Sequence, residues 1–115
     1  MMNPIPNRYN TTEITFYTEN AIKAGAPVSI TSDGVAIAAP KGHPFYGICT
    51  KSEGNYVTVA LAGIITAKYS GEINNVGYLF MSSDGEGNIQ FDLSSDYEYR
   101  VLKYNKEDQT VTIIL

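Results

Sequence analysis

The chain has 115 residues, 43% hydrophobic and 17% charged, a composition that suits one globular domain with one compact core. No apolar run approaches the roughly 18 residues of a membrane-spanning helix, so we expect no membrane contact. The formal net charge is −4, and the eight basic residues are scattered singly along the chain. Because nucleic-acid binding needs clustered Lys and Arg side chains, we expect no nucleic-acid partner.

The first residues lack hydrophobic periodicity, and the segment Pro4-Ile5-Pro6 favours an extended backbone. We therefore predict an extended arm over residues 1–11, followed by a single β-domain over residues 12–115. Such an arm could anchor the chain on a neighbouring subunit, and the alternative is a frayed terminus. The candidate interface residues in the arm are Ile5, Arg8 and Tyr9.

The remaining apolar segments alternate with a period of two, and no window keeps helical spacing, which predicts an all-β fold. Gly63 is expected to bend the backbone between two separate strands. The predicted strands are residues 12–17, 27–30, 35–38, 45–50, 56–62, 64–69, 77–82, 89–93, 98–104 and 110–115. We expect the last of these strands to lie in the middle of the sheet.

The same order of features occurs twice along the chain. One copy begins at Gly25 and contains the turn Ser32-Asp33-Gly34, and the other begins at Gly77 and contains Ser83-Asp84-Gly85. Each copy ends on an alternating strand, at an offset of about 51 to 54 residues. This predicts two copies of one β-unit. The alternative is that the shared motifs are common in β-strands and turns and coincide by chance. About ten short strands predict a small Greek-key-like barrel, with a two-sheet sandwich as the alternative.

Few side chains suited to catalysis or metal binding are present. His43 is the only histidine and lies in a Gly-Pro loop, whereas Cys49, the only cysteine, lies in an apolar strand. We therefore expect Cys49 to be buried and not to form a catalytic pair with His43. The Asp-Gly turns lack the spacing of an EF-hand, so Asp33 and Asp84 are expected to bond their own backbone. We predict no catalytic residue, metal or cofactor, and hence no enzyme.

The nine tyrosines are the main resource for recognition, because tyrosine offers a large contact area with a polar tip. In a β-domain of this size we expect most of them to lie at the rim of the core. The chain has no tryptophan, the residue that often forms a sugar-binding platform, so glycan binding is the less favoured use of these aromatic side chains.

Three segments in a fixed order resemble the small all-β head-decoration and head-fibre proteins of tailed bacteriophages and prophages. They are Ile22-Lys23-Ala24-Gly25-Ala26-Pro27-Val28, Phe45-Tyr46-Gly47-Ile48, and Tyr56-Val57-Thr58-Val59-Ala60-Leu61-Ala62-Gly63, and the resemblance covers roughly residues 21–115.

The resemblance implies a non-enzymatic virion protein, made in the bacterial cytoplasm, that binds the major capsid protein on an assembled head. It also implies a homo-oligomer and brings no catalytic residues. A short arm without a long fibre-forming segment argues against a fibre role. The alternative function is that of a glycan- or protein-binding β-module.

Overall fold

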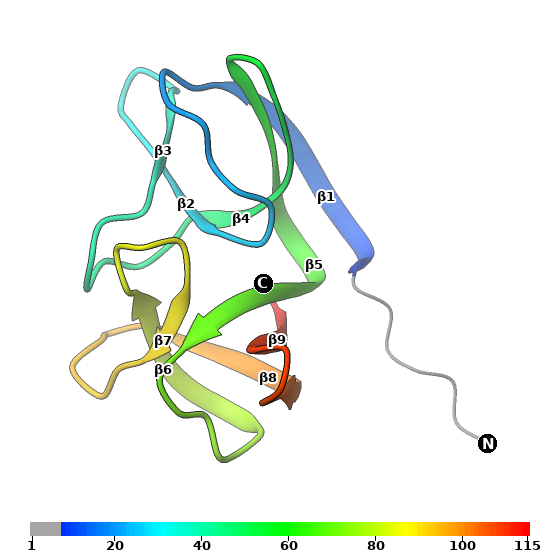
Figure 1. Cartoon of the computed structure of the whole chain (residues 1–115), viewed down its shortest axis with the longest axis vertical. Coiled ribbons are helices and arrows are strands. Elements are labelled where there is room, and N and C mark those ends of the chain that lie inside the picture. The colour runs from blue at the N-terminus through cyan, green and yellow to red at the C-terminus, as the bar shows by residue number, and fades with distance from the viewer. Residues whose placement is uncertain (1–7) are drawn as a thin grey trace.

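The computed structural model describes residues 8–115, which form nine β-strands and no helix (Figure 1). The strands are β1 (Arg8–Tyr17), β2 (Pro27–Ile30), β3 (Ala36–Ala38), β4 (Gly47–Glu53), β5 (Tyr56–Ser70), β6 (Gly77–Ser83), β7 (Ile89–Phe91), β8 (Glu98–Asn105) and β9 (Thr110–Ile114). The predicted all-β fold is confirmed. The strands close into a barrel, which is the preferred prediction, and not into the alternative two-sheet sandwich.

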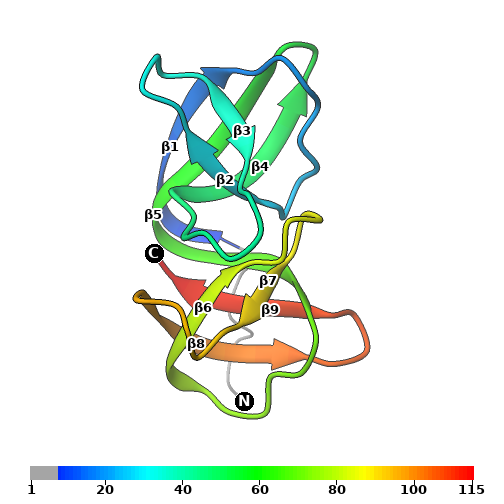
Figure 2. The same cartoon turned by 90° about the vertical axis from the view of Figure 1, so that its left-hand side faces the viewer.

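The strands form two five-stranded units that share β5, stacked along the long axis of the molecule (Figure 2). In the first unit, residues 8–62, the strand order is β1-β5-β4-β2-β3. In the second unit, residues 64–115, the order is β5-β9-β8-β6-β7. The second unit is a closed barrel, since β7 pairs in parallel with the end of β5.

The two units repeat each other in register as well as in order. A register shift lies between Cys49 and Lys51 in β4, and an equivalent shift lies between Val101 and Lys103 in β8. Each unit also carries a cross-strand pair of threonine hydroxyls between its first and last strands. Their oxygens are 3.2 Å apart for Thr15–Thr58 and 2.8 Å apart for Thr66–Thr112. The predicted repetition is therefore confirmed in topology and register.

The prediction of two strands separated by Gly63 is wrong, because β5 runs unbroken through this residue. Gly63 has a φ of +102°, which glycine tolerates well. A Cβ atom at this position would lie 2.6 Å from the carbonyl oxygen of Asn10, in the irregular part of β1. Gly63 thus bends one continuous strand, which is why residues 8–115 form nine strands instead of ten.

The boundary predicted between arm and barrel is also wrong. β1 begins at Arg8, and the backbones of Arg8 and Tyr9 pair with Ile65 and Ile64 of β5. Residues 8–11 therefore belong to the barrel because they complete the β1–β5 ladder. Residues 1–7, including Ile5, lie outside the described part of the chain.

Each unit has a hydrophobic core, and a connection from the first unit joins them. The first core consists of Ile22, Ala26, Val28, Ala36, Cys49, Val57 and Val59. The second core includes residues of β5, β6, β8 and β9 together with Ala39, Phe45 and Ile48 from the first unit. The Phe45 ring stacks on Tyr99 at 4.3 Å between centroids, and the Gly42 N–H donates to the Ser83 carbonyl at 2.8 Å. These contacts fix the two units against each other.

The last strand lies in the middle of the sheet, as predicted. β9 pairs with β5 on one side and with β8 on the other, and Val111 and Ile113 are buried in the second core.

Candidate functional site

The connection between β7 and β8, which we call the 92–97 loop, displays apolar side chains to solvent. Leu93 is 76% exposed, the largest value among the exposed large hydrophobic residues of the described chain, and Tyr97 is 52% exposed. Phe91, at the end of β7, is also exposed. The prediction of a strand over residues 89–93 is wrong at its end, because β7 stops at Phe91 and Leu93 lies in the loop.

Internal hydrogen bonds fix the start of this loop. The Asp92 carboxylate accepts the Ser82 hydroxyl at 2.7 Å and both the hydroxyl and the backbone N–H of Ser94, at 2.6 and 3.0 Å. The hydrogen bonds from Ser94, followed by that from Ser82, hold the pKa of Asp92 below its usual value. The ionised carboxylate is therefore the form that holds the loop.

Further hydrogen bonds tie the end of the loop to β6. The Ser95 hydroxyl donates to the Met81 carbonyl at 2.8 Å and accepts the Tyr97 N–H at 3.1 Å. The Met81 N–H in turn donates to the Tyr97 carbonyl at 3.2 Å. Polar groups of the loop thus point toward the barrel while Leu93 and Tyr97 point outward. A preorganised loop of this kind loses little conformational entropy when a partner binds.

The equivalent connection in the first unit, residues 39–46, has a different environment. Phe45 occupies the position of Tyr97 relative to the shared bulge, yet Phe45 is only 6% exposed because it packs on the second unit. The Ser83 hydroxyl donates to the Ala39 carbonyl at 2.7 Å and fixes the same connection. Phe45 is therefore covered by the second unit, whereas Tyr97, at the equivalent position, is exposed.

The charge around the 92–97 loop is uniformly negative in sequence. Between Tyr69 and Tyr99 the chain has six acidic residues and no lysine or arginine. Asp96 and Glu98 are exposed beside Tyr97. The next basic residue, Arg100, is occupied by Tyr78: its guanidinium donates to the phenol oxygen at 2.7 Å and lies 5.0 Å from the ring centroid. The loop therefore combines an apolar centre with an acidic rim.

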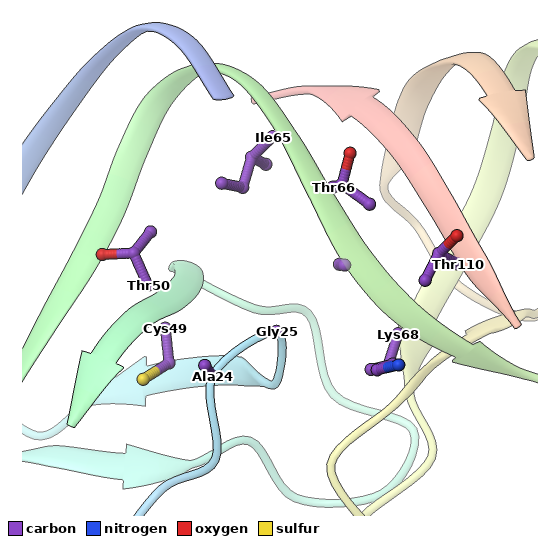
Figure 3. A pocket seen from close by; sticks show the side chains of 9 residues that line it. Ala24, Gly25, Cys49, Thr50, Ile65, Thr66, Lys68 and Thr110 are labelled. Carbon is purple, nitrogen blue, oxygen red and sulfur yellow. The ribbon is translucent and has the colours of Figure 1, made fainter. Parts of the chain in front are cut away.

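A pocket of about 360 Å³ opens between the two units beside β5 (Figure 3). Two of the three threonine hydroxyls on its wall are engaged: Thr50 donates to Glu13 at 2.8 Å, and Thr66 is bonded to Thr112. Lys68 and Thr110 lie at one end, and Cys49 lies at the other. The lining residues include no His, Asp or Glu side chain that could act as a base for the thiol. We therefore assign no chemistry to this pocket.

Cys49 is buried, as predicted, and its sulfur faces the backbone carbonyls of Ile22 and Lys51 at 3.7 and 3.6 Å. Burial raises the pKa of the thiol, and the hydrogen bond to the Lys51 backbone offsets this only in part. His43 lies in the 39–46 connection, where its carbonyl accepts the Ser83 N–H. Cys49 thus belongs to the first core, whereas the His43 side chain is exposed.

The Asp84 carboxylate closes the turn between β6 and β7. It accepts the backbone N–H groups of Glu86 and Asn88 at 2.7 and 3.0 Å, the Ser70 hydroxyl at 2.7 Å and the Asn88 amide at 2.9 Å. Partial burial alone would raise the pKa of Asp84, but these bonds hold it below its usual value. The predicted bonding of this Asp to its own backbone is confirmed. Within residues 8–115, no group of three or more His, Cys, Asp or Glu side chains is placed to hold a metal.

The interface predicted at Ile5, Arg8 and Tyr9 stays a prediction. Ile5 lies outside the described residues, and the backbones of Arg8 and Tyr9 are paired in β1. Sequence reasoning missed Leu93 and Tyr97. The usable indication was the stretch from Tyr69 to Tyr99 without a basic residue, in which the loop lies.

Comparisons with known proteins leave the family open. No protein-family model matches the chain, and no curated protein matches it significantly. Among the described residues, no helix is long and apolar enough to cross a membrane.

Proposed function

We propose that the chain is a non-enzymatic structural protein of a phage or prophage virion, which decorates or stabilises the head by binding the major capsid protein. The observation that carries the proposal is a rigid two-unit β-scaffold with a preorganised loop that exposes Leu93 and Tyr97. The resemblance of residues 21–115 to head-decoration proteins supports the same function. A protein that binds only the assembled shell stabilises that shell by mass action.

The first test is whether the chain is a component of the particle. Virus-like particles would be purified from an induced culture of the source organism, and the copy number of the chain would be measured by mass spectrometry relative to the major shell protein. We expect copy numbers close to that of the shell protein. Absence from well-formed particles of the same genetic element would contradict decoration and would favour the glycan- or protein-binding alternative, which a glycan array would then test.

The candidate arm has its own test. Deleting residues 1–7 leaves the whole of β1 intact, whereas deleting residues 1–10 would remove part of the ladder with β5. We expect the 1–7 deletion to keep the unfolding free energy of the full chain and to weaken shell binding. Unchanged binding would remove Ile5 from the proposed interface, while Arg8 and Tyr9 would need separate substitutions.

A further inference from the structure

In the first unit, the residue equivalent to Tyr97 packs against the other unit. Phe45 stacks on Tyr99, and Gly42 in the same connection donates its N–H to the Ser83 carbonyl. In the second unit, the corresponding Tyr97 is 52% exposed. Exposed aromatic and aliphatic side chains on a rigid frame are typical centres of protein interfaces.

The charges around the loop decide which partner fits it. Asp96 and Glu98 are exposed on either side of Tyr97, and no lysine or arginine occurs between Tyr69 and Tyr99. A second copy that docked through the same loop would bring the same acidic side chains, so like charges would face each other and disfavour that contact. A surface rich in Lys or Arg is the complement.

We propose that the 92–97 loop is the surface that binds the shell, and that it docks in an apolar hollow of the shell protein surrounded by Lys or Arg side chains. This inference rests on the proposed function and adds the surface and the chemistry of its partner. Leu93 and Tyr97 fill the hollow, and Asp96 and Glu98 pair with its basic rim. Asp92 holds the loop through Ser82 and Ser94.

The test uses shells purified from a strain that lacks this chain, and co-sedimentation with the purified full-length protein. Leu93→Ser combined with Tyr97→Ser should weaken binding on the order of tenfold or more, because central apolar contacts dominate interface energies. The matched control removes two side chains that are exposed on the first unit, Tyr46→Ser with Ile37→Ser, and should stay within about twofold.

A second pair of variants tests the charge. Asp96→Lys with Glu98→Lys should weaken binding on the order of tenfold at low salt. We expect wild-type binding to weaken as the salt concentration rises, and this salt dependence should be absent in the double variant. Glu19→Lys with Glu107→Lys changes the net charge equally at exposed positions elsewhere, and Glu107 lies at the opposite end of β8. Urea denaturation of every variant separates lost contacts from lost fold.

The outcomes distinguish the two proposals. If wild-type protein does not bind shells, the proposed function fails and takes this inference with it. Wild-type binding with unchanged affinity in both loop variants would overturn the inference alone. Sedimentation of free protein as a dimer that Leu93→Ser dissociates would assign the loop to a second copy and would also overturn it. A joint loss of affinity in the loop variants, with both controls intact, supports it.

Discussion

The two units share strand order, register and a threonine pair, but the same position has a different environment in each. Ile14 in β1 and Ile65 in β5 occupy equivalent places, yet Ile14 is 46% exposed and Ile65 is 4% exposed. The parallel closure is a single Thr18–Ala36 bridge in the first unit and a two-residue ladder in the second. The second unit is thus the more complete barrel. The repeated topology thus determines the position of a residue in each unit, while the chain packed around that position determines whether the side chain is buried or exposed.

The largest effect is expected at the bend that joins the units. Gly63→Ala should lower the free energy of unfolding by about 3 kcal/mol or more, because it adds a backbone clash with Asn10 to an unfavourable φ. Gly71→Ala is the matched control, since Gly71 has a φ of +77° and nothing within 4 Å of the added Cβ. It should cost about 1 kcal/mol. Urea denaturation measures both, and equal losses would show that the backbone of β1 yields easily.

The covered and uncovered connections give the sharpest pair of substitutions. Phe45→Ala should cost about 3 kcal/mol of unfolding free energy, because it removes a buried ring that stacks on Tyr99. Tyr97→Ala, at the equivalent exposed position, should change stability by no more than about 0.5 kcal/mol. A large loss from Tyr97→Ala would mean that the 92–97 loop supports the fold and is not free for a partner.

The threonine pairs allow a subtler comparison. Thr112 is buried, so Thr112→Val should cost about 1 kcal/mol by leaving the Thr66 hydroxyl without its partner. The Thr15–Thr58 pair is exposed and water can replace it, so Thr58→Val should stay within about 0.5 kcal/mol. The same denaturation assay applies, and equal costs would show that burial does not separate the two pairs.

The smallest effect concerns pH. The hydrogen bonds to Asp84 lower its folded pKa, so its contribution to stability is present above the unfolded value of about 3.9 and is lost as pH falls through the lower folded value. The loss should be small, because the carboxylate is partly exposed and screened.

Asp84→Asn should flatten this dependence in urea denaturation series between pH 2 and pH 7. Asp33→Asn is the control, because the equivalent turn of the first unit is closed by Thr31, whose hydroxyl accepts the Val35 N–H at 3.2 Å. A steeper decline in Asp84→Asn than in the wild type would contradict the direction assigned to this pKa.

Local patterns were enough to predict most of the strands and both Asp-Gly turns, because alternation and turn chemistry are properties of neighbouring residues. The repeat was also visible from Gly25 and Gly77, but its first strand was missed. The first strand of the repeat contains Ile14-Thr15 in the first copy and Ile65-Thr66 in the second. Their equivalence becomes visible only from their pairing, with β5 in the first unit and with β9 in the second. Gly63 suggested a break between strands because the contact that explains this glycine, with the backbone of Asn10, joins residues that are distant in sequence.

The candidate surface was harder to predict for the same reason. Leu93 continues an alternating apolar pattern after Ile89, which predicted that the strand runs to Leu93. What turns the chain after Phe91 is the anchoring of Asp92 by Ser82 and of Ser95 by the Met81 carbonyl, contacts made across β6. The burial of Phe45 depends on its packing against the second unit, a contact between residues distant in sequence, whereas the equivalent Tyr97 is exposed.

β5 supplies the last strand of one barrel and the first strand of the other without an intervening linker. Any rotation of one barrel relative to the other would have to twist this single strand and separate Phe45 from Tyr99. The two units are therefore held in a fixed relative orientation. If the protein bound a partner surface through the 92–97 loop, the first unit would lie at a set distance and direction from that surface. Many bound copies would then present the first unit in the same orientation.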